Sequence, residues 1–82
     1  MDAVDEVRIT PLRQVRIGAT GRLVVAGAAT ATVQRLMAMG LVPGTTVTII
    51  RVAPLGDPIM LQAGAFQVTL RKGEADGLAI ES

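Results

Sequence analysis

The segment Thr45–Val52 constrains the fold most, because seven of its eight residues are β-branched. β-branched side chains favour strands, so we expect this to be the strongest strand of the chain. Two apolar pairs occur in it, Val47 with Ile49 and Ile50 with Val52, and they point to opposite faces of a regular strand. This change of face predicts a β-bulge or a sharply bent strand of a barrel.

The other strands are predicted to be short. Pro and Gly separate them, and both residues favour turns. Ile59–Ala63 and Phe66–Leu70 flank Gly64-Ala65 and predict a hairpin. The remaining expected strands are Val7–Leu12 ending at Pro11, Arg22–Ala26, and a last one around Leu78 and Ile80. Between Arg71 and Gly77 we expect a polar turn or one helical turn around Glu74 and Ala75.

One helix is predicted, and it begins near Thr30. Val33, Leu36 and Met37 have the spacing of one helix face. Thr30 or Thr32 can cap its first amides, and Gly40 is placed to end it. The 82 residues are expected to form a single domain, residues 1–82, with residues 1–6 as a frayed tail. The fold class we predict is mainly β: a small, strongly bent β-barrel with one short α-helix.

Missing residue types exclude several functions. The chain has no Cys, His, Trp or Tyr and a single Phe, Phe66. Without His and Cys it lacks ligands for zinc fingers, haem and iron–sulfur clusters, and it has no Cys nucleophile or His base. With only one aromatic residue, the chain has no stacking platform for single-stranded nucleic acid and no aromatic groove for Pro-rich peptides. We therefore expect no enzyme and no cofactor.

The charge and hydropathy of the sequence limit the classes of partner and the cellular locations that we expect. The net charge is +1, and the seven Arg and one Lys are scattered along the chain, so we expect no nucleic-acid partner. The longest apolar stretch, Leu23–Ala31, is far shorter than the ~20 residues of a membrane helix. The acidic first residues do not form a secretory signal. These features predict a cytoplasmic protein that does not insert into a membrane.

Two motifs resemble a known family. Arg35-Leu-Met-Ala-Met-Gly-Leu-Val-Pro-Gly44 resembles the RLxxMGLxPG signature of the FeoA family, and Ala53-Pro-Leu-Gly-Asp-Pro58 with Ile59 resembles its APLGDPI signature. Leu70-Arg71 followed by Glu74-Ala75 is similar to a third block, and the likeness runs from about Leu12 to Glu81. The chain departs from the family pattern at Gly27-Ala28, where a Gly pair is common, and at Ala65, which replaces the Gly before the aromatic residue.

The resemblance implies an SH3-like β-barrel with one inserted helix. It also implies a small cytosolic accessory or regulatory protein of bacterial ferrous iron uptake. Its partner would be the membrane permease FeoB, bound at the cytosolic face or at the GTPase domain. The alternative is an SH3-like sensor or interaction domain related to the C-terminal domain of DtxR-type metal-dependent repressors. The sequence leaves open whether the chain forms a homo-oligomer.

Five residues are candidates for partner contact: Leu36, Met39, Leu41, Leu55 and Asp57. Leu36, Met39 and Leu41 belong to the helix and its exit, which hold more apolar side chains than one helix face can bury. The alternative is that all of them pack on the barrel. Leu55 and Asp57 lie in a loop whose Pro and Gly residues could serve the turn alone or also contact a partner. We expect no catalytic residue and no metal site, because the carboxylates are separated by strands and no His is present.

Overall fold

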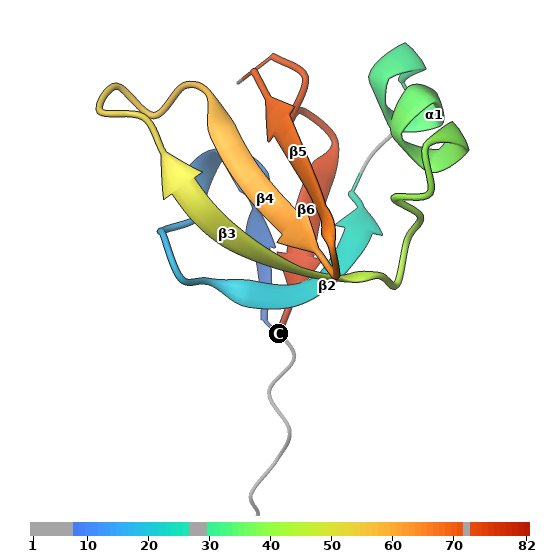
Figure 1. The fold of residues 1–82 in the computed structure, drawn as a ribbon, viewed down its shortest axis with the longest axis horizontal. Coiled ribbons are helices and arrows are strands. Elements are labelled where there is room, and N and C mark those ends of the chain that lie inside the picture. The colour runs from blue at the N-terminus through green and yellow to red at the C-terminus, as the bar shows by residue number, and fades with distance from the viewer. Residues whose placement is uncertain (1–7, 27–29, 72) are drawn as a thin grey trace, which may run out of the picture.

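The structure is a computed structural model that describes residues 8–26, 30–71 and 73–82. The frayed tail expected at residues 1–6 and the departure at Gly27-Ala28 lie outside the described residues. The described residues form one antiparallel sheet that curves into a barrel, and one α-helix lies at one end of it (Figure 1). The prediction of a mainly β, SH3-like barrel with one short helix is confirmed.

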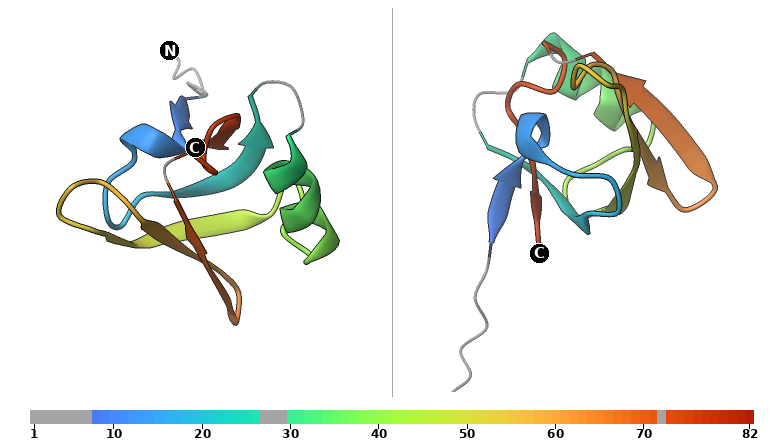
Figure 2. Two further views of the ribbon diagram at one scale, coloured as in Figure 1. Left: turned by 90° about the horizontal axis from the view of Figure 1, so that it is seen from above. Right: turned by 90° about the vertical axis from the view of Figure 1, so that its left-hand side faces the viewer.

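Six strands form the sheet in the order β1-β6-β2-β3-β4-β5. The last strand of the chain therefore lies between the first two, which closes the barrel with residues far apart in sequence (Figure 2). The strands are β1 Ile9–Pro11, β2 Thr20–Val25, β3 Thr46–Val52, β4 Ile59–Ala63, β5 Phe66–Leu70 and β6 Leu78–Glu81.

β3 carries the predicted bulge. Ile49 pairs with Leu61, but the next paired residue, Arg51, faces Met60, so Ile50 is the extra residue on β3. The bulge bends the strand and lets side chains on both sides of Ile50 reach the core. Val47 and Ile49, before the bulge, are fully buried, and Val52, after it, packs against the core. The hairpin of β4 and β5 has the predicted bounds.

The helix α1 spans Ala31–Ala38. The hydroxyl of Thr30, one of the two predicted caps, accepts a hydrogen bond of 3.1 Å from the backbone N–H of Val33. At the other end Gly40 has φ +103°, and the N–H of Leu41 donates to the Leu36 carbonyl at 2.9 Å. This Schellman pattern ends the helix and turns the chain back toward the barrel.

Sequence reasoning missed one short element, the 3-10 helix η1 at Leu12–Gln14. It follows Pro11 directly, and it places Leu12 in the core with no exposed surface. Between β5 and β6, residues 73–77 form turns, and no helix is found among the described residues of this segment. The Arg71 carbonyl accepts from the N–H groups of both Glu74 and Ala75.

A single apolar cluster fills the barrel and reaches under α1. Val33 and Leu36 from α1 pack in the same cluster as the inward residues of the strands. Among the described residues no polar or charged side chain is buried in it. The buried members are Leu12, Leu23, Val33, Leu36, Leu41, Val47, Ile49, Ile59, Leu61, Val68, Leu70, Ala75, Leu78 and Ile80.

Candidate functional site

The loop between β3 and β4, residues Ala53–Pro58, presents the most exposed large apolar side chain among the described residues. Leu55 is 90% exposed. The loop closes at its base with a hydrogen bond from the Ala53 N–H to the Pro58 carbonyl (3.1 Å), and the N–H of Gly56 donates back to the Ala53 carbonyl (2.7 Å). These bonds hold Leu55 at the tip. An exposed Leu on a hydrogen-bonded loop is suited to insert into an apolar pocket of another protein.

Asp57 lies in the same loop, two residues after Leu55. It is half-buried, and its peptide bond to Pro58 is cis. Its backbone follows Gly56, whose φ of +82° belongs to the left-handed region that Gly adopts most easily. The loop therefore brings one apolar and one acidic candidate residue to the same region.

Of the three candidate residues in α1 and at its exit, one is exposed and two are buried. Met39 is 51% exposed, and Val42, which the sequence did not single out, is 44% exposed. Leu36 and Leu41 are 2% and 1% exposed. Their burial follows from the Schellman pattern, in which the residue after the terminal Gly packs against the last turn of the helix. Leu36 and Leu41 are thus core residues in this structure and offer no surface to a partner.

The two candidate surfaces do not meet. The Ala53–Pro58 loop lies at one end of the molecule and α1 with its exit at the other, in both the view of Figure 1 and the view from above in Figure 2. Leu55 and Met39 therefore cannot belong to one compact contact with a small partner surface. A docking surface must be built around one of them.

Sequence reasoning missed Ile17 beside the Leu55 end. Ile17 is 63% exposed and precedes Gly18, whose φ is +91°. The N–H of Gly18 donates to the Ile49 carbonyl at 2.7 Å, which ties this turn to β3. The turn and the Ala53–Pro58 loop lie at the same end of the barrel (Figures 1 and 2). Ile17 could have been identified from the sequence, because it is an apolar residue directly before a turn glycine.

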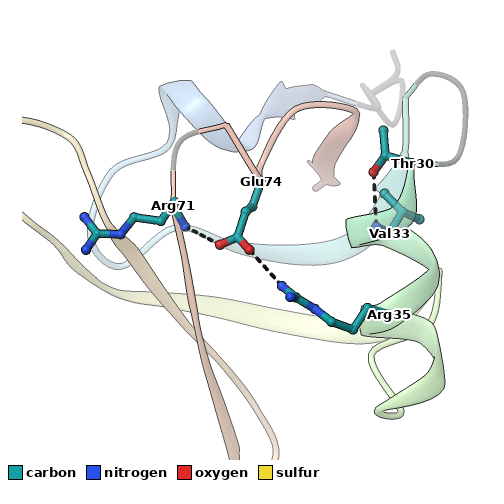
Figure 3. A network of polar contacts seen from close by, with 5 residues as sticks. All are labelled: Thr30, Val33, Arg35, Arg71 and Glu74. Atoms are coloured by element: carbon teal, nitrogen blue, oxygen red, sulfur yellow. Dashed lines mark hydrogen bonds and ion pairs between the residues drawn. The ribbon is translucent and has the colours of Figure 1, made fainter.

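A polar network fixes α1 to the barrel (Figure 3). Arg35 Nη2 donates to Glu74 Oε2 at 2.8 Å, and the backbone N–H of Arg71 donates to Glu74 Oε1 at 2.9 Å. The Arg71 N–H, and after it the Arg35 side chain, lower the pKa of Glu74 below its ordinary value of 4.5. Hydrogen bonds to the ionised carboxylate cause this direction.

The described residues contain no group of three or more His, Cys, Asp or Glu that could hold a metal ion. Within the same residues, no helix is both long and apolar enough to cross a membrane.

The model of the FeoA domain matches residues 10–82, which is most of the chain. The chain belongs to the FeoA family. The family is associated with ferrous iron transport, and it is not a known family of enzymes. The matched range includes α1 and the Ala53–Pro58 loop, the two segments whose motifs carried the resemblance.

Two relatives agree with this assignment. A fusion protein of Fe(2+) transport protein A and the Fe(2+) transporter FeoB from Porphyromonas gingivalis (strain ATCC BAA-308 / W83) is 35% identical over 48 residues, 58% of this chain but only 6% of that protein. The crystal structure of an iron uptake regulatory protein (FeoA) is similar with a TM-score of 0.75 at 26% identity, covering 92% of this chain and all of that one.

A manganese-dependent transcriptional repressor shares the fold. Its TM-score is 0.80, with 16% identity, over 96% of this chain and 44% of the repressor chain. At this identity the likeness shows the fold alone. It places the chain's architecture among SH3-like domains that also occur as parts of larger proteins.

Proposed function

We propose that this chain is a cytoplasmic accessory protein of ferrous iron uptake that binds a FeoB-type permease at its cytosolic face or GTPase domain. Membership of the FeoA family supports the role in iron uptake. The fusion relative supports the partner, because it joins the A and B proteins in one chain. A covalent link of this kind keeps two binding partners at high effective concentration.

The proposed contact with the partner rests on the exposed tip of the Ala53–Pro58 loop. Leu55 is almost fully exposed, and burying a Leu side chain stabilises a contact by about 1.5–3 kcal/mol. The turn that contains Ile17 lies at the same end (Figure 1) and adds a second apolar side chain, and Asp57 in the loop adds a polar one. We propose Leu55 as the anchor and Asp57 as a rim contact. Met39 marks the competing surface at the opposite end.

Such a contact can regulate the partner without chemistry by this chain. A bound protein shifts its partner between conformations only if it binds one of them more tightly. If the preferred conformation is that of one nucleotide state of the GTPase domain, binding changes GTP turnover. The proposed mechanism therefore requires affinities that differ between nucleotide states.

The test is a titration of this chain into the GTPase domain and into the full permease, with GTP turnover measured in parallel. We expect Leu55→Ser to weaken binding by at least about tenfold, since truncated anchor residues cost more than about 1.4 kcal/mol. Its melting temperature should stay within about two degrees of the wild type because the side chain contacts solvent.

Met39→Ser is the matched control, because Met39 is also an exposed apolar residue but lies at the other end. It should leave affinity unchanged. If Met39→Ser lowers the affinity and Leu55→Ser does not, the docking surface is at the α1 exit and not at the loop. If the chain binds neither the GTPase domain nor the permease in any nucleotide state, the proposed function is contradicted. The alternative is then a role as a domain of another assembly, as the fold has in the repressor.

A further inference from the structure

A groove of about 450 Å³ opens between β1, β6 and the segment that joins β1 to β2. It lies apart from the exposed Leu55 and from Met39, neither of which lines it. Its size is in the range of sites that bind small ligands or short peptide segments. The lining residues are Arg8, Thr10, Gln14, Val15, Arg16, Ala19, Thr20, Ile80 and Ser82.

The strand register explains which side chains meet there. Arg8 and Ser82 exchange two backbone hydrogen bonds (3.1 and 2.9 Å), and Thr10 pairs with Ile80 two residues further along. Side chains two apart on a strand share a face, so these four point to one side of the sheet. Arg16, in the segment that joins β1 to β2, lines the same groove.

Among the described residues, two arginine side chains and no Asp or Glu side chain line the groove. Three of the carboxylates in the described residues pair with other arginines: Asp76 with Arg13 at 3.3 Å, Glu81 with Arg22 at 3.1 Å and Glu74 with Arg35 at 2.8 Å. Glu81 belongs to β6, but strand alternation turns it to the face opposite Ile80. Arg8 and Arg16 form no ion pair within the described residues.

The floor of the groove is apolar. Ile80 is only 3% exposed, and Val15 and Ala19 are half-buried beside the core. Thr10 and Gln14 add polar side chains to the lining. The groove therefore offers two cationic contacts around an aliphatic surface, with no aromatic ring on which a nucleotide base could stack.

We propose that this groove binds an acidic peptide segment of a protein partner. A guanidinium group binds a carboxylate through two parallel hydrogen bonds, so Arg8 and Arg16 can each take one acidic side chain. An aliphatic side chain between the two acids covers the floor.

The sheet edge favours a peptide over a small oxyanion. In the described residues β1 has one strand neighbour, β6. Because Arg8 and Ser82 form a hydrogen-bonded pair, the N–H and C=O of Ile9 point away from β6. An extended segment can pair with these groups and direct alternate side chains to the face that carries Arg8. A phosphate ion would use the arginines and leave the edge and the floor uncovered.

The test is a nuclear magnetic resonance titration of the full chain with a short blocked peptide that alternates glutamate with leucine. We expect amide shifts confined to residues 8–20 and 80–82. Arg8→Glu with Arg16→Glu should weaken binding at least about tenfold, and raising salt from about 50 to about 300 mM should also weaken it. The double Lys variant should bind with intermediate affinity, since Lys keeps the charge and loses the paired geometry.

Arg51→Glu is the matched control, because Arg51 is an exposed arginine outside the groove. It should bind the peptide like the wild type. Equal binding of a peptide with glutamine in place of glutamate, equal loss with Arg51→Glu, shifts elsewhere on the protein, or phosphate binding as tightly as the peptide would each overturn the proposal. Melting curves of all variants establish that a loss of binding is not a loss of fold. The permease takes no part in this test, so its result is independent of the function proposed above.

Discussion

Arg35 and Glu74 form an ion pair of 2.8 Å across 39 positions of sequence. Arg35 lies in the last turn of α1, and Glu74 lies in the turns between β5 and β6. The second Glu74 oxygen accepts from the Arg71 N–H (Figure 3). One carboxylate thus holds the helix and the last connection of the barrel together, on the surface above the apolar contacts of Val33 and Leu36.

Glu74→Gln is expected to lower the stability at neutral pH and to lose this effect in acid. The pKa of Glu74 is lowered in the folded protein, so its ionised form stabilises the fold above the ordinary pKa of 4.5. That stabilisation is lost as the pH falls through the lowered pKa. Thermal melts at several pH values should show the wild type and variant converging below pH 4.5.

The companion variant Arg35→Gln separates the two contacts of Glu74. The Arg71 N–H is the larger cause of the lowered pKa and remains in this variant. The carboxyl titration of Glu74, followed by carbon resonances, should move only part of the way back to its ordinary value. A complete return would show that the backbone bond depends on the ion pair.

Leu41→Ala should be far more destabilising than Met39→Ala, although only Gly40 separates the two residues. Leu41 is 1% exposed, and truncating a buried Leu costs about 2–5 kcal/mol. Met39 is half-exposed, and its truncation should cost no more than about 0.5 kcal/mol. Chemical denaturation measures both. Equal costs would contradict the assignment of Leu41 to the core.

Gly21→Ala should destabilise the β2–β6 contact. A Cβ at this position would lie 2.5 Å from the Glu81 carbonyl oxygen, and backbone cannot move aside as a flexible side chain can. We expect a loss of about 1–3 kcal/mol in the free energy of unfolding. Gly73→Ala is the control, because a Cβ there meets no atom within 4 Å. It should be neutral or stabilise by up to about 1 kcal/mol.

Thr30→Ala tests the cap of α1. The variant leaves the Val33 N–H without its 3.1 Å acceptor, and losing such a cap costs about 1 kcal/mol. Thr30→Ser should keep most of the stability because it retains the hydroxyl. If Thr30→Ser were as unstable as Thr30→Ala, the methyl group and not the cap would carry the effect. Denaturant midpoints with unchanged slopes distinguish these outcomes.

Strands with strong local signals could be predicted from the sequence. The β4–β5 hairpin has the predicted bounds because alternation and the Gly64 turn are both local. The bulge in β3 followed from two apolar pairs on opposite faces and is confirmed at Ile50. The 3-10 helix η1 was missed because three residues after a Pro carry no periodic pattern.

The candidate contact residues were predictable only in part. The sequence showed that the α1 region holds more apolar residues than one helix face can bury. It did not show which of them are exposed, because that depends on the Schellman turn at Gly40 and on the barrel beneath it. The structure puts Leu36 and Leu41 in the core and leaves Met39 and Val42 outside. Leu55, from the loop, is the predicted contact residue with the largest exposed fraction.

By itself the sequence determined the class of fold, the α-helix that begins after Thr30, the family motifs and the absence of His and Cys, since each depends on residue type and local spacing. Only the tertiary structure decided that the Leu55 loop and the α1 exit lie at opposite ends. It also decided that Arg8 and Arg16 share a groove. The physical reason is the strand order: β6 pairs with β1 and β2, so residues 78–82 meet residues 8–11 and 22–25 through backbone pairing that no local pattern encodes.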